Sequence, residues 1–203
     1  LAMARRVDAA QDPYRLIVSQ PMTAEPGTRW RYNNGVGELA GGVVQKAVGR
    51  RLDDFARDVL FEPLGITDWE WGRMASGDPS ASWGLRLSPR DLAKIGQLVL
   101  DEGVWQGRRI VSADWVREMI RPHVAGPTFA YAYLWWREGS PADGRGVERI
   151  RGTGWGGQCL EIVPSLALVV VATAGAYDFD GRGPQNLACD AAMETVLRAT
   201  VQR

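Results

Sequence analysis

Pro26-Gly27-Thr28-Arg29-Trp30-Arg31-Tyr32-Asn33-Asn34 and Gly152-Thr153-Gly154-Trp155-Gly156-Gly157-Gln158 are the two stretches of sequence that decide the fold. The first runs from a Pro-Gly turn to a tyrosine and two asparagines, and a helical pattern follows it. The second places four glycines around a threonine and a tryptophan, and a β-rich run follows it. Taken alone, the first stretch is a common helix cap and turn, and the second marks a bulge or a close approach of two backbones.

Helical patterns dominate the first half of the chain. Apolar residues recur at intervals of three and four over residues 36–48, which predicts a helix with one buried face. Asn34 is well placed as the N-cap of that helix. Ser88 and Ser112 begin two further helices, and the first of these carries proline in its first turn. Shorter helical patterns cover residues 12–20 and 52–60, and residues 69–82 are predicted to form a loop.

The later part of the chain changes to a β-rich pattern. Residues 131–136, 158–163 and 166–174 are predicted strands, and Pro164-Ser165 makes a hairpin between the last two. A closing amphipathic helix covers residues 187–201. This order, helices first and then strands with a final helix, predicts an α/β (α+β) fold in which helices flank an antiparallel sheet.

The composition fits one well-packed domain over residues 1–203, since 45% of the residues are hydrophobic. We expect residues 1–130 to be mainly helical and residues 131–203 to carry the sheet strands and the C-terminal helix. The formal net charge is zero and basic residues form no cluster, so no nucleic-acid partner is predicted. The longest apolar run, residues 166–176, is shorter than the roughly 20 residues that a membrane span needs.

The cysteines and the histidine give no sign of a metal or cofactor site. Cys159 and Cys189 can form at most one disulfide, and Cys159 lies in an apolar run where a buried free thiol is the commoner state. The cellular compartment therefore stays open. His123 is the single histidine, follows a proline in an apparent loop, and is predicted to be structural or solvated. A zinc site lacks a His/Cys cluster, and a Ser-His-Asp triad lacks its Gly-x-Ser-x-Gly elbow.

The two stretches together resemble the serine β-lactamase and penicillin-binding-protein superfamily, in particular its class C-like and esterase branch. The first is similar to the Tyr-x-Asn segment and the second to the Lys/His-Thr-Gly strand of that family. Residues 84–96, 105–111 and 131–136 resemble further family segments, so the resemblance covers almost the whole chain. It implies a β-lactamase/transpeptidase-like fold and a serine hydrolase activity through an acyl-enzyme.

One signature of that family, Ser-x-x-Lys, cannot be written anywhere in the sequence. The two lysines, Lys46 and Lys94, are preceded three positions earlier by Val43 and Asp91. We therefore expect the nucleophile, its helix and the first sheet strands on an N-terminal part outside this chain. The chain alone is predicted to be inactive and to need a complementary N-terminal segment or a separate chain as its partner.

The resemblance assigns roles to six residues. Tyr32 matches the family's base, and Asn34 matches the amide that binds a substrate carbonyl and orients the lysine. Gly152, Thr153 and Gly154 occupy the Lys/His-Thr-Gly position, where Thr153 lines the substrate edge. The backbone N–H of Trp155 is expected to be one of two oxyanion donors, and the other belongs to the absent serine.

The chain departs from the β-lactamases at Gly152, where those enzymes carry a lysine or histidine that helps to hold a substrate carboxylate. Strand alternation should send Arg151 to the opposite face. We therefore expect a small-molecule ester or amide with a neutral acyl group as substrate, and no cofactor. The alternative is a non-catalytic protein that keeps the β-lactamase fold for ligand binding or as an interaction module.

Overall fold

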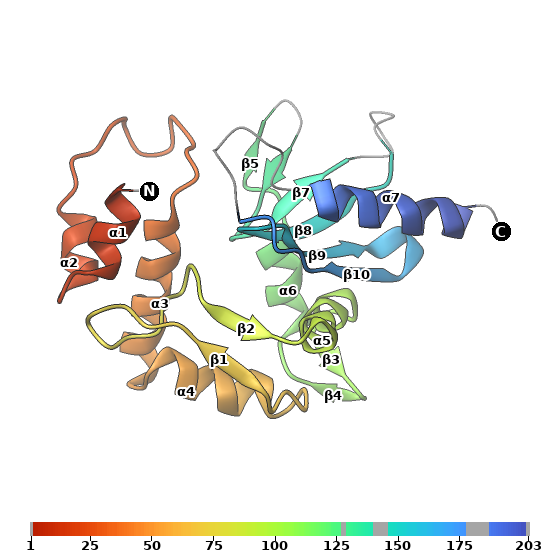
Figure 1. Cartoon of the computed structure of the whole chain (residues 1–203), viewed down its shortest axis with the longest axis horizontal. Coiled ribbons are helices and arrows are strands. Elements are labelled where there is room, and N and C mark those ends of the chain that lie inside the picture. Colours follow the sequence, from red (N-terminus) through yellow and green to blue (C-terminus); the bar gives the residue numbers. More distant parts are fainter. Residues whose placement is uncertain (1, 127–128, 140–145, 178–186, 202–203) are drawn as a thin grey trace. The chain divides into compact units, whose positions relative to one another are not determined.

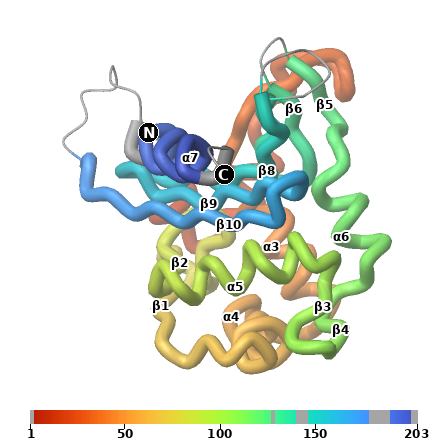
Figure 2. The backbone as a smooth tube through the Cα atoms, turned by 90° about the vertical axis from the view of Figure 1, so that its right-hand side faces the viewer, coloured from red at the N-terminus to blue at the C-terminus, as the bar shows by residue number. Residues whose placement is uncertain are grey.

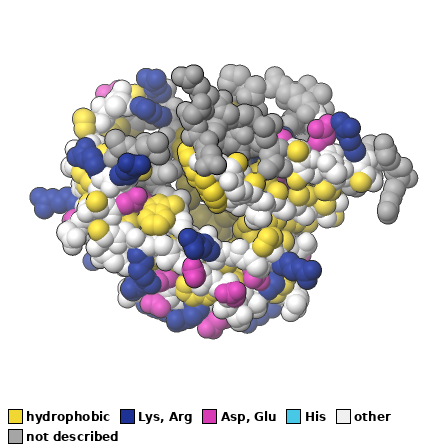
Figure 3. Space-filling model, in the orientation of Figure 1, with side chains coloured by type: hydrophobic (Ala, Val, Ile, Leu, Met, Phe, Trp, Pro, Cys, Tyr) yellow, Lys and Arg dark blue, Asp and Glu magenta, His cyan; other side chains and the backbone are white. Residues whose placement is uncertain are grey.

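The computed structural model describes residues 2–126, 129–139, 146–177 and 187–201. The chain divides into two compact units, Leu1–Leu87 and Ser88–Arg203, which are described separately below. Within the described residues, no helix has the length and apolar character that crossing a membrane requires. On the face drawn in Figure 3, basic and acidic side chains are interspersed, which agrees with the zero net charge of the sequence.

The first unit consists mainly of helices (Figure 1). Its buried core includes Phe61, whose ring lies 5.3 Å from the ring of Trp69 and 6.2 Å from that of Trp71. Gly49 ends the long helix in the left-handed conformation, with φ of 65°. The elements are α1 (Ala2–Asp8), α2 (Pro13–Val18), α3 (Asn34–Val48), α4 (Leu52–Ala56), a π-helical turn (Arg57–Phe61), β1 (Trp69–Trp71) and β2 (Leu85–Leu87).

Three details of this unit correct the sequence predictions. Asn33, not Asn34, is the N-cap of α3, because its side chain accepts a hydrogen bond from Gly35 N at 2.9 Å while Asn34 already has helical geometry. Residues 69–82 are not all loop, since Trp69–Trp71 pairs with Leu85–Leu87 as an antiparallel ribbon. The helix predicted over 52–60 is regular only as far as Ala56 and then widens into the π-helical turn.

The second unit contains a six-stranded sheet in the order β10-β9-β8-β7-β6-β5, in which every neighbouring pair is antiparallel. This confirms the predicted antiparallel sheet with helices. The predicted strand over 131–136 is not continuous: Tyr131 ends one short strand, Trp136 begins the next, and a tight connection with Leu134 at φ of 65° lies between them. The elements are α5 (Pro89–Leu100), β3 (Val104–Trp105), β4 (Arg108–Arg109), α6 (Ala113–Ile120), β5 (Val124–Ala125), β6 (Ala130–Tyr131), β7 (Trp136–Glu138), β8 (Arg149–Gly154), β9 (Gln158–Val163), a 3-10 turn (Pro164–Leu166), β10 (Leu168–Ala172) and α7 (Leu187–Val201).

The helices α5 and α6 begin where the sequence predicts. Ser88 caps α5 by accepting a hydrogen bond from Asp91 N at 3.1 Å, and Ser112 caps α6 by accepting one from Trp115 N at 3.3 Å. Both caps satisfy backbone N–H groups that a helix leaves without an internal partner. The helix starts are therefore encoded locally.

The sheet buries two chemically different faces, and Figure 2 shows α5 and α7 on opposite sides of β9 and β10. Ile150 and Ile162 pair in register and pack with Val99 and Val116 from α5 and α6. The opposite face carries charged groups beneath α7. Since side chains alternate along a strand, neighbours in sequence on β8 and β9 contribute to different faces.

A disulfide joins Cys159 on β9 to Cys189 at the start of α7, with Cα atoms 6.0 Å apart. The sequence allowed this one disulfide but favoured a free thiol at Cys159 from its apolar surroundings, and the structure corrects that preference. The two cysteines are 30 positions apart in sequence, so only tertiary packing brings them together. A loop of that size implies a stabilisation of about 3–4 kcal/mol in the chain-entropy description.

Candidate active site

Tyr32 lies in the extended segment that leads into α3, and its side chain is 54% exposed. The cap formed by Asn33 ends this extended segment and begins the helix, so Tyr32 comes immediately before the cap. Asn34 is the first residue of α3 and is also exposed. Its carbonyl oxygen accepts a hydrogen bond from Ser82 Oγ at 2.6 Å, which ties the start of the helix to residues far along the chain.

Glu38 is a buried carboxylate that anchors the same helix, and the sequence predictions did not include it. Glu38 is only 3% exposed. Its carboxylate oxygens accept hydrogen bonds from Ser80 Oγ at 2.5 Å and from Ala81 N at 2.8 Å. A buried charge needs such partners. A Cβ on Gly41 would lie 2.6 Å from Ala81 Cβ, so glycine allows this close packing. An acidic residue on a glycine-rich helix face is the sequence signal that could have revealed this contact.

The second predicted segment lies at the end of β8 and continues into a short hairpin loop. Gly152, Thr153 and Gly154 pair with Leu160, Cys159 and Gln158 on β9. Thr153, Gly154 and Trp155 are exposed. A Cβ on Gly152 would meet no heavy atom within 4 Å among the described residues. Alternation places Thr153 on the same face as Cys159, whereas Gly152 shares the face of Leu160.

The six predicted site residues therefore fall into two sets. Tyr32 and Asn34 lie together at the start of α3 in the first unit. Gly152, Thr153, Gly154 and Trp155 lie together at the β8–β9 hairpin in the second unit.

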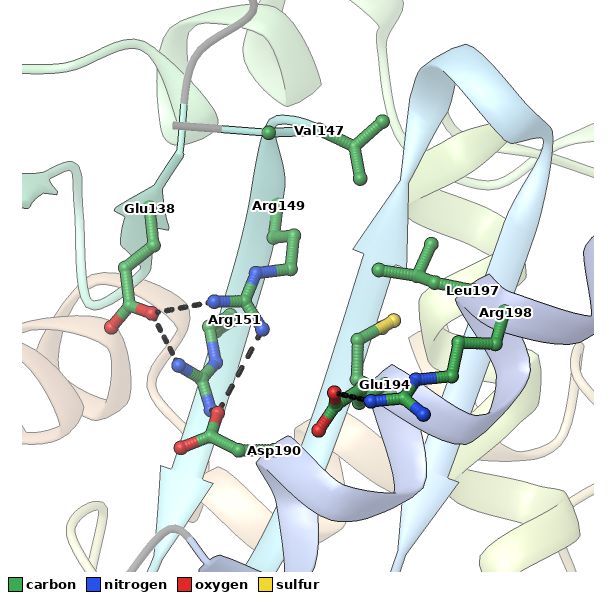
Figure 4. Close-up of a pocket in the computed structure, with 10 residues that line it drawn as sticks. Glu138, Val147, Arg149, Arg151, Asp190, Glu194, Leu197 and Arg198 are labelled. Carbon is green, nitrogen blue, oxygen red and sulfur yellow. Dashed lines mark hydrogen bonds and ion pairs between the residues drawn. The ribbon is translucent and has the colours of Figure 1, made fainter. Parts of the chain in front are cut away.

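Arg149 and Arg151 belong to a network of ion pairs on the face that α7 covers (Figure 4). The Arg151 side chain is 2% exposed, and its Nη2 lies 3.0 Å from both Glu161 Oε1 and Asp190 Oδ1. Arg149 lies 3.3 Å from Glu138 and 3.4 Å from Glu161, and Arg151 also pairs with Glu138. The predicted orientation of Arg151 away from the face of Gly152 agrees with this arrangement.

The network holds three carboxylates and two guanidinium groups. Burial and these charges shift the pKa values of Glu161 and Arg151. Burial raises the pKa of Glu161, and the two arginines offset this only in part. Burial alone would lower the pKa of Arg151, but the carboxylates of Glu161, Glu138 and Asp190 outweigh it and raise that pKa above its ordinary value. Glu161 Oε1 accepts no directed hydrogen bond from the described residues, so its contact with Arg151 is mainly Coulombic.

A hollow of about 620 Å³ lies beside this network and is lined from β7, β8 and α7. Its charged side chains pair with one another, including Arg198 with Glu194 across one turn of α7 (Figure 4). It contains none of the six predicted site residues. We therefore do not identify it with the active site.

His123 has a structural setting, in line with the sequence prediction. Its ring stacks on Tyr133 with centroids 4.0 Å apart, and its Nε2 lies 3.3 Å from the carbonyl oxygen of Glu118. In the part of the chain that the structure describes, no group of three His, Cys, Asp or Glu side chains could hold a metal ion.

Comparisons with known proteins identify the family of this chain and several relatives. The sequence profile of the beta-lactamase family matches residues 2–187. The chain is 32% identical over 191 residues to the 6-aminohexanoate-dimer hydrolase of Paenarthrobacter ureafaciens, covering 88% of this chain and 47% of the relative. It is 35% identical over 87 residues to the lovastatin esterase of Penicillium rubens, covering 43% of this chain and 21% of the esterase.

Solved structures agree with this match at the level of the fold. The octameric penicillin-binding-protein homologue from Pyrococcus abyssi superimposes with a TM-score of 0.74 at 17% identity, covering 94% of this chain and 48% of the other. The chain thus spans less than half the length of these relatives.

Proposed function

Because the chain belongs to the beta-lactamase family of serine hydrolases, we propose that it forms the tyrosine-bearing part of an enzyme that cleaves an ester or amide through an acyl-enzyme. The observation that carries the proposal is that two family motifs occur in one chain, within the residues that the family profile matches. Tyr32-x-Asn34 stands at a helix start, and Gly152-Thr153-Gly154-Trp155 stands at the exposed end of a strand. Two relatives are named as a hydrolase and an esterase, which agrees with this reaction class.

The proposed nucleophile is a serine on a Ser-x-x-Lys segment outside this sequence. Its hydroxyl attacks the substrate carbonyl and gives its proton to Tyr32, which passes it to the leaving group. A tyrosine acts as a base only as the phenolate, which a neighbouring cation stabilises, so the proposal needs a cation beside Tyr32. The lysine of the same segment supplies that cation in this proposal.

The proposed oxyanion donors are the backbone N–H of Trp155 and the N–H of the absent serine. Together they stabilise the negative charge that develops on the carbonyl oxygen in the tetrahedral intermediate. Collapse of the intermediate releases the alcohol or amine and leaves the acyl group on the serine. Water activated by Tyr32 then hydrolyses the acyl-enzyme, and the proton returns to the serine.

The sheet of the second unit offers an edge for the complementary segment. β10 is the terminal strand in the sheet order, and its five residues Leu-Val-Val-Val-Ala are all half-buried. A terminal strand presents backbone N–H and C=O groups that a further strand can pair with. We propose that strands from the complementary N-terminal segment add at β10. A soluble, cooperatively folding monomer of these 203 residues would count against the need for a complementary segment.

The proposed substrate has a neutral acyl group. Gly152 brings no cation to the position where the β-lactamases carry lysine or histidine. Arg149 and Arg151 cannot replace it from the described arrangement, since both are held in ion pairs beneath α7. A substrate carboxylate would therefore gain no charge-assisted hydrogen bond from β8.

The decisive experiment combines this chain with its proposed N-terminal segment and follows a nitrophenyl ester. A burst of nitrophenol, together with an added acyl mass on the nucleophile segment, would support the acyl-enzyme proposal. Absence of both in the assembled protein would refute it. The second candidate, a non-catalytic ligand-binding or interaction module that keeps the same fold, predicts neither the burst nor the added mass.

A further inference from the structure

The segment that follows β10 folds back onto the hairpin loop between β8 and β9. Ala176 N donates a hydrogen bond to the carbonyl oxygen of Gly156 at 3.1 Å. The side-chain amide nitrogen of Gln158 donates to the carbonyl oxygen of Ala174 and to the Tyr177 hydroxyl, the latter at 3.2 Å. The segment 174–177 therefore holds the loop Trp155–Gly157, directly through Ala176 and also through the Gln158 side chain at the start of β9.

The ring of Tyr177 adds a direct contact with the loop backbone. A Cβ on Gly156 would lie 2.3 Å from Tyr177 Cε1, so the ring packs against the Cα of this glycine at a distance that no other residue permits. Gly156 and Gly157 have φ of 81° and 89°, in the left-handed region that favours glycine. The Tyr177 side chain remains 57% exposed, so this contact is not part of the hydrophobic core.

These contacts matter because the loop begins with the proposed oxyanion donor. A backbone N–H stabilises an oxyanion effectively only when it is held at about 2.7–3.1 Å from the position of the developing charge. Glycines have more conformational freedom than other residues, so a loop containing two in succession needs external restraint. The Gln158 and Tyr177 contacts supply that restraint within the second unit.

We propose that Gln158 and Tyr177 are positioning residues that hold the Trp155 N–H in its oxyanion-binding orientation. This inference rests on the proposed function, because the oxyanion role of the Trp155 N–H belongs to that proposal. Neither Gln158 nor Tyr177 takes part in the chemistry itself. It predicts that loss of these contacts slows the chemical step and leaves substrate binding nearly unchanged.

The kinetic test compares Tyr177→Ala, Tyr177→Phe and Gln158→Ala in the assembled enzyme with a nitrophenyl ester. Removing an oxyanion donor lowers kcat by about 10²–10³-fold, and misplacing one should cost less, so we expect roughly a tenfold fall for Tyr177→Ala. KM should change by less than about twofold, because the interaction is made in the transition state. Tyr177→Phe keeps the ring on Gly156 and should retain most of the activity. Tyr133→Ala removes another half-exposed tyrosine of the same unit and should leave kcat unchanged.

Amide hydrogen exchange gives a second readout that does not depend on turnover. The Ala176 N–H, which donates to Gly156, should exchange about tenfold faster in Tyr177→Ala than in the wild type, while core strand amides keep their protection. If Tyr177→Ala does not fold, Gln158→Ala provides the same test without loss of the ring. Unchanged exchange would overturn the restraint, and faster exchange with unchanged kcat would overturn the positioning role. A wild type without ester turnover would refute the proposed function and leave the exchange test standing.

Discussion

Replacing Arg151 with methionine should destabilise the protein in a way that depends on pH. The arginine side chain is 2% exposed and the Glu161 side chain is 0% exposed, and the two face each other in register across β8 and β9. Methionine is unbranched, shorter than arginine and uncharged, so the substitution leaves Glu161 as a buried carboxylate without its nearest cation. Removing one partner of a buried ion pair typically costs about 3–5 kcal/mol, or roughly 6–20 °C in Tm for a chain of this size.

The sign of the pH dependence follows from the raised pKa of Glu161. Burial raises this pKa above its ordinary value, so the folded state binds the proton more tightly than the unfolded state. The stabilisation from the bound proton is complete below the ordinary pKa and is lost as pH rises through the folded pKa. The other charged groups that face Glu161 are Arg149, Glu138 and Asp190. Loss of Arg151 removes a group that lowers the pKa of Glu161, so the defect should shrink at acidic pH.

Denaturant unfolding at pH 5 and pH 7.5 measures this effect. We expect Arg151→Met to be more destabilising at pH 7.5, and Glu161→Gln, which mimics the neutral acid, to be milder. The double variant should recover at least half of the loss at pH 7.5, since it no longer buries an unpaired charge. Arg198→Met is the control, because Arg198 pairs with Glu194 on the exposed side of α7 and should contribute less than about 1 kcal/mol. Equal destabilisation at both pH values, or strictly additive losses, would refute this reasoning.

Four further predictions concern catalysis, the helix cap, substrate choice and the disulfide. In the assembled enzyme, Tyr32→Phe should lower the acylation rate by roughly 10²–10⁴-fold with folding nearly intact, and unchanged turnover would remove Tyr32 from the mechanism. Asn34→Ala should lower the rate less than Tyr32→Phe, while Asn33→Ala should instead lower helix stability by about 1 kcal/mol, as measured by thermal unfolding. Gly152→Lys places its Cβ where no heavy atom of the described residues lies within 4 Å, and it should improve kcat/KM for a chromogenic cephalosporin relative to a nitrophenyl ester by about ten- to a hundredfold. Efficient wild-type cephalosporin hydrolysis would contradict the neutral-substrate proposal. Cys189→Ser should cost about 3–4 kcal/mol of stability under oxidising conditions and nothing further under reducing ones, and equal stability of both forms would argue against the disulfide.

The sequence by itself determined the elements whose signals are local. Ser88 and Ser112 each cap a helix because a hydroxyl accepts from a backbone N–H three residues ahead, and both segments form as predicted. The strands around Gln158–Val163 and the closing helix Leu187–Val201 follow from periodicity in the same way. The two motif segments, read with the family they resemble, also identified the fold.

Tertiary structure decided the features that depend on residues far apart in the chain. Trp69–Trp71 becomes a strand because Leu85–Leu87 lies beside it, although its own sequence resembles a loop. Cys159 is paired rather than free because α7 brings Cys189 to it. Such pairings depend on the packing of whole elements, which periodicity and turn signals along one segment do not encode.

The same division holds within the candidate site. Tyr32 and Trp155 were predicted from sequence only through the motifs that resemble the family, and their roles stay predictions. Glu38 and Tyr177 were not among the predicted residues. Their contacts with Ser80, Ala81 and Gly156 join positions far apart in the chain. A buried carboxylate and a ring that packs on a glycine can be recognised only when the fold brings their partners within reach.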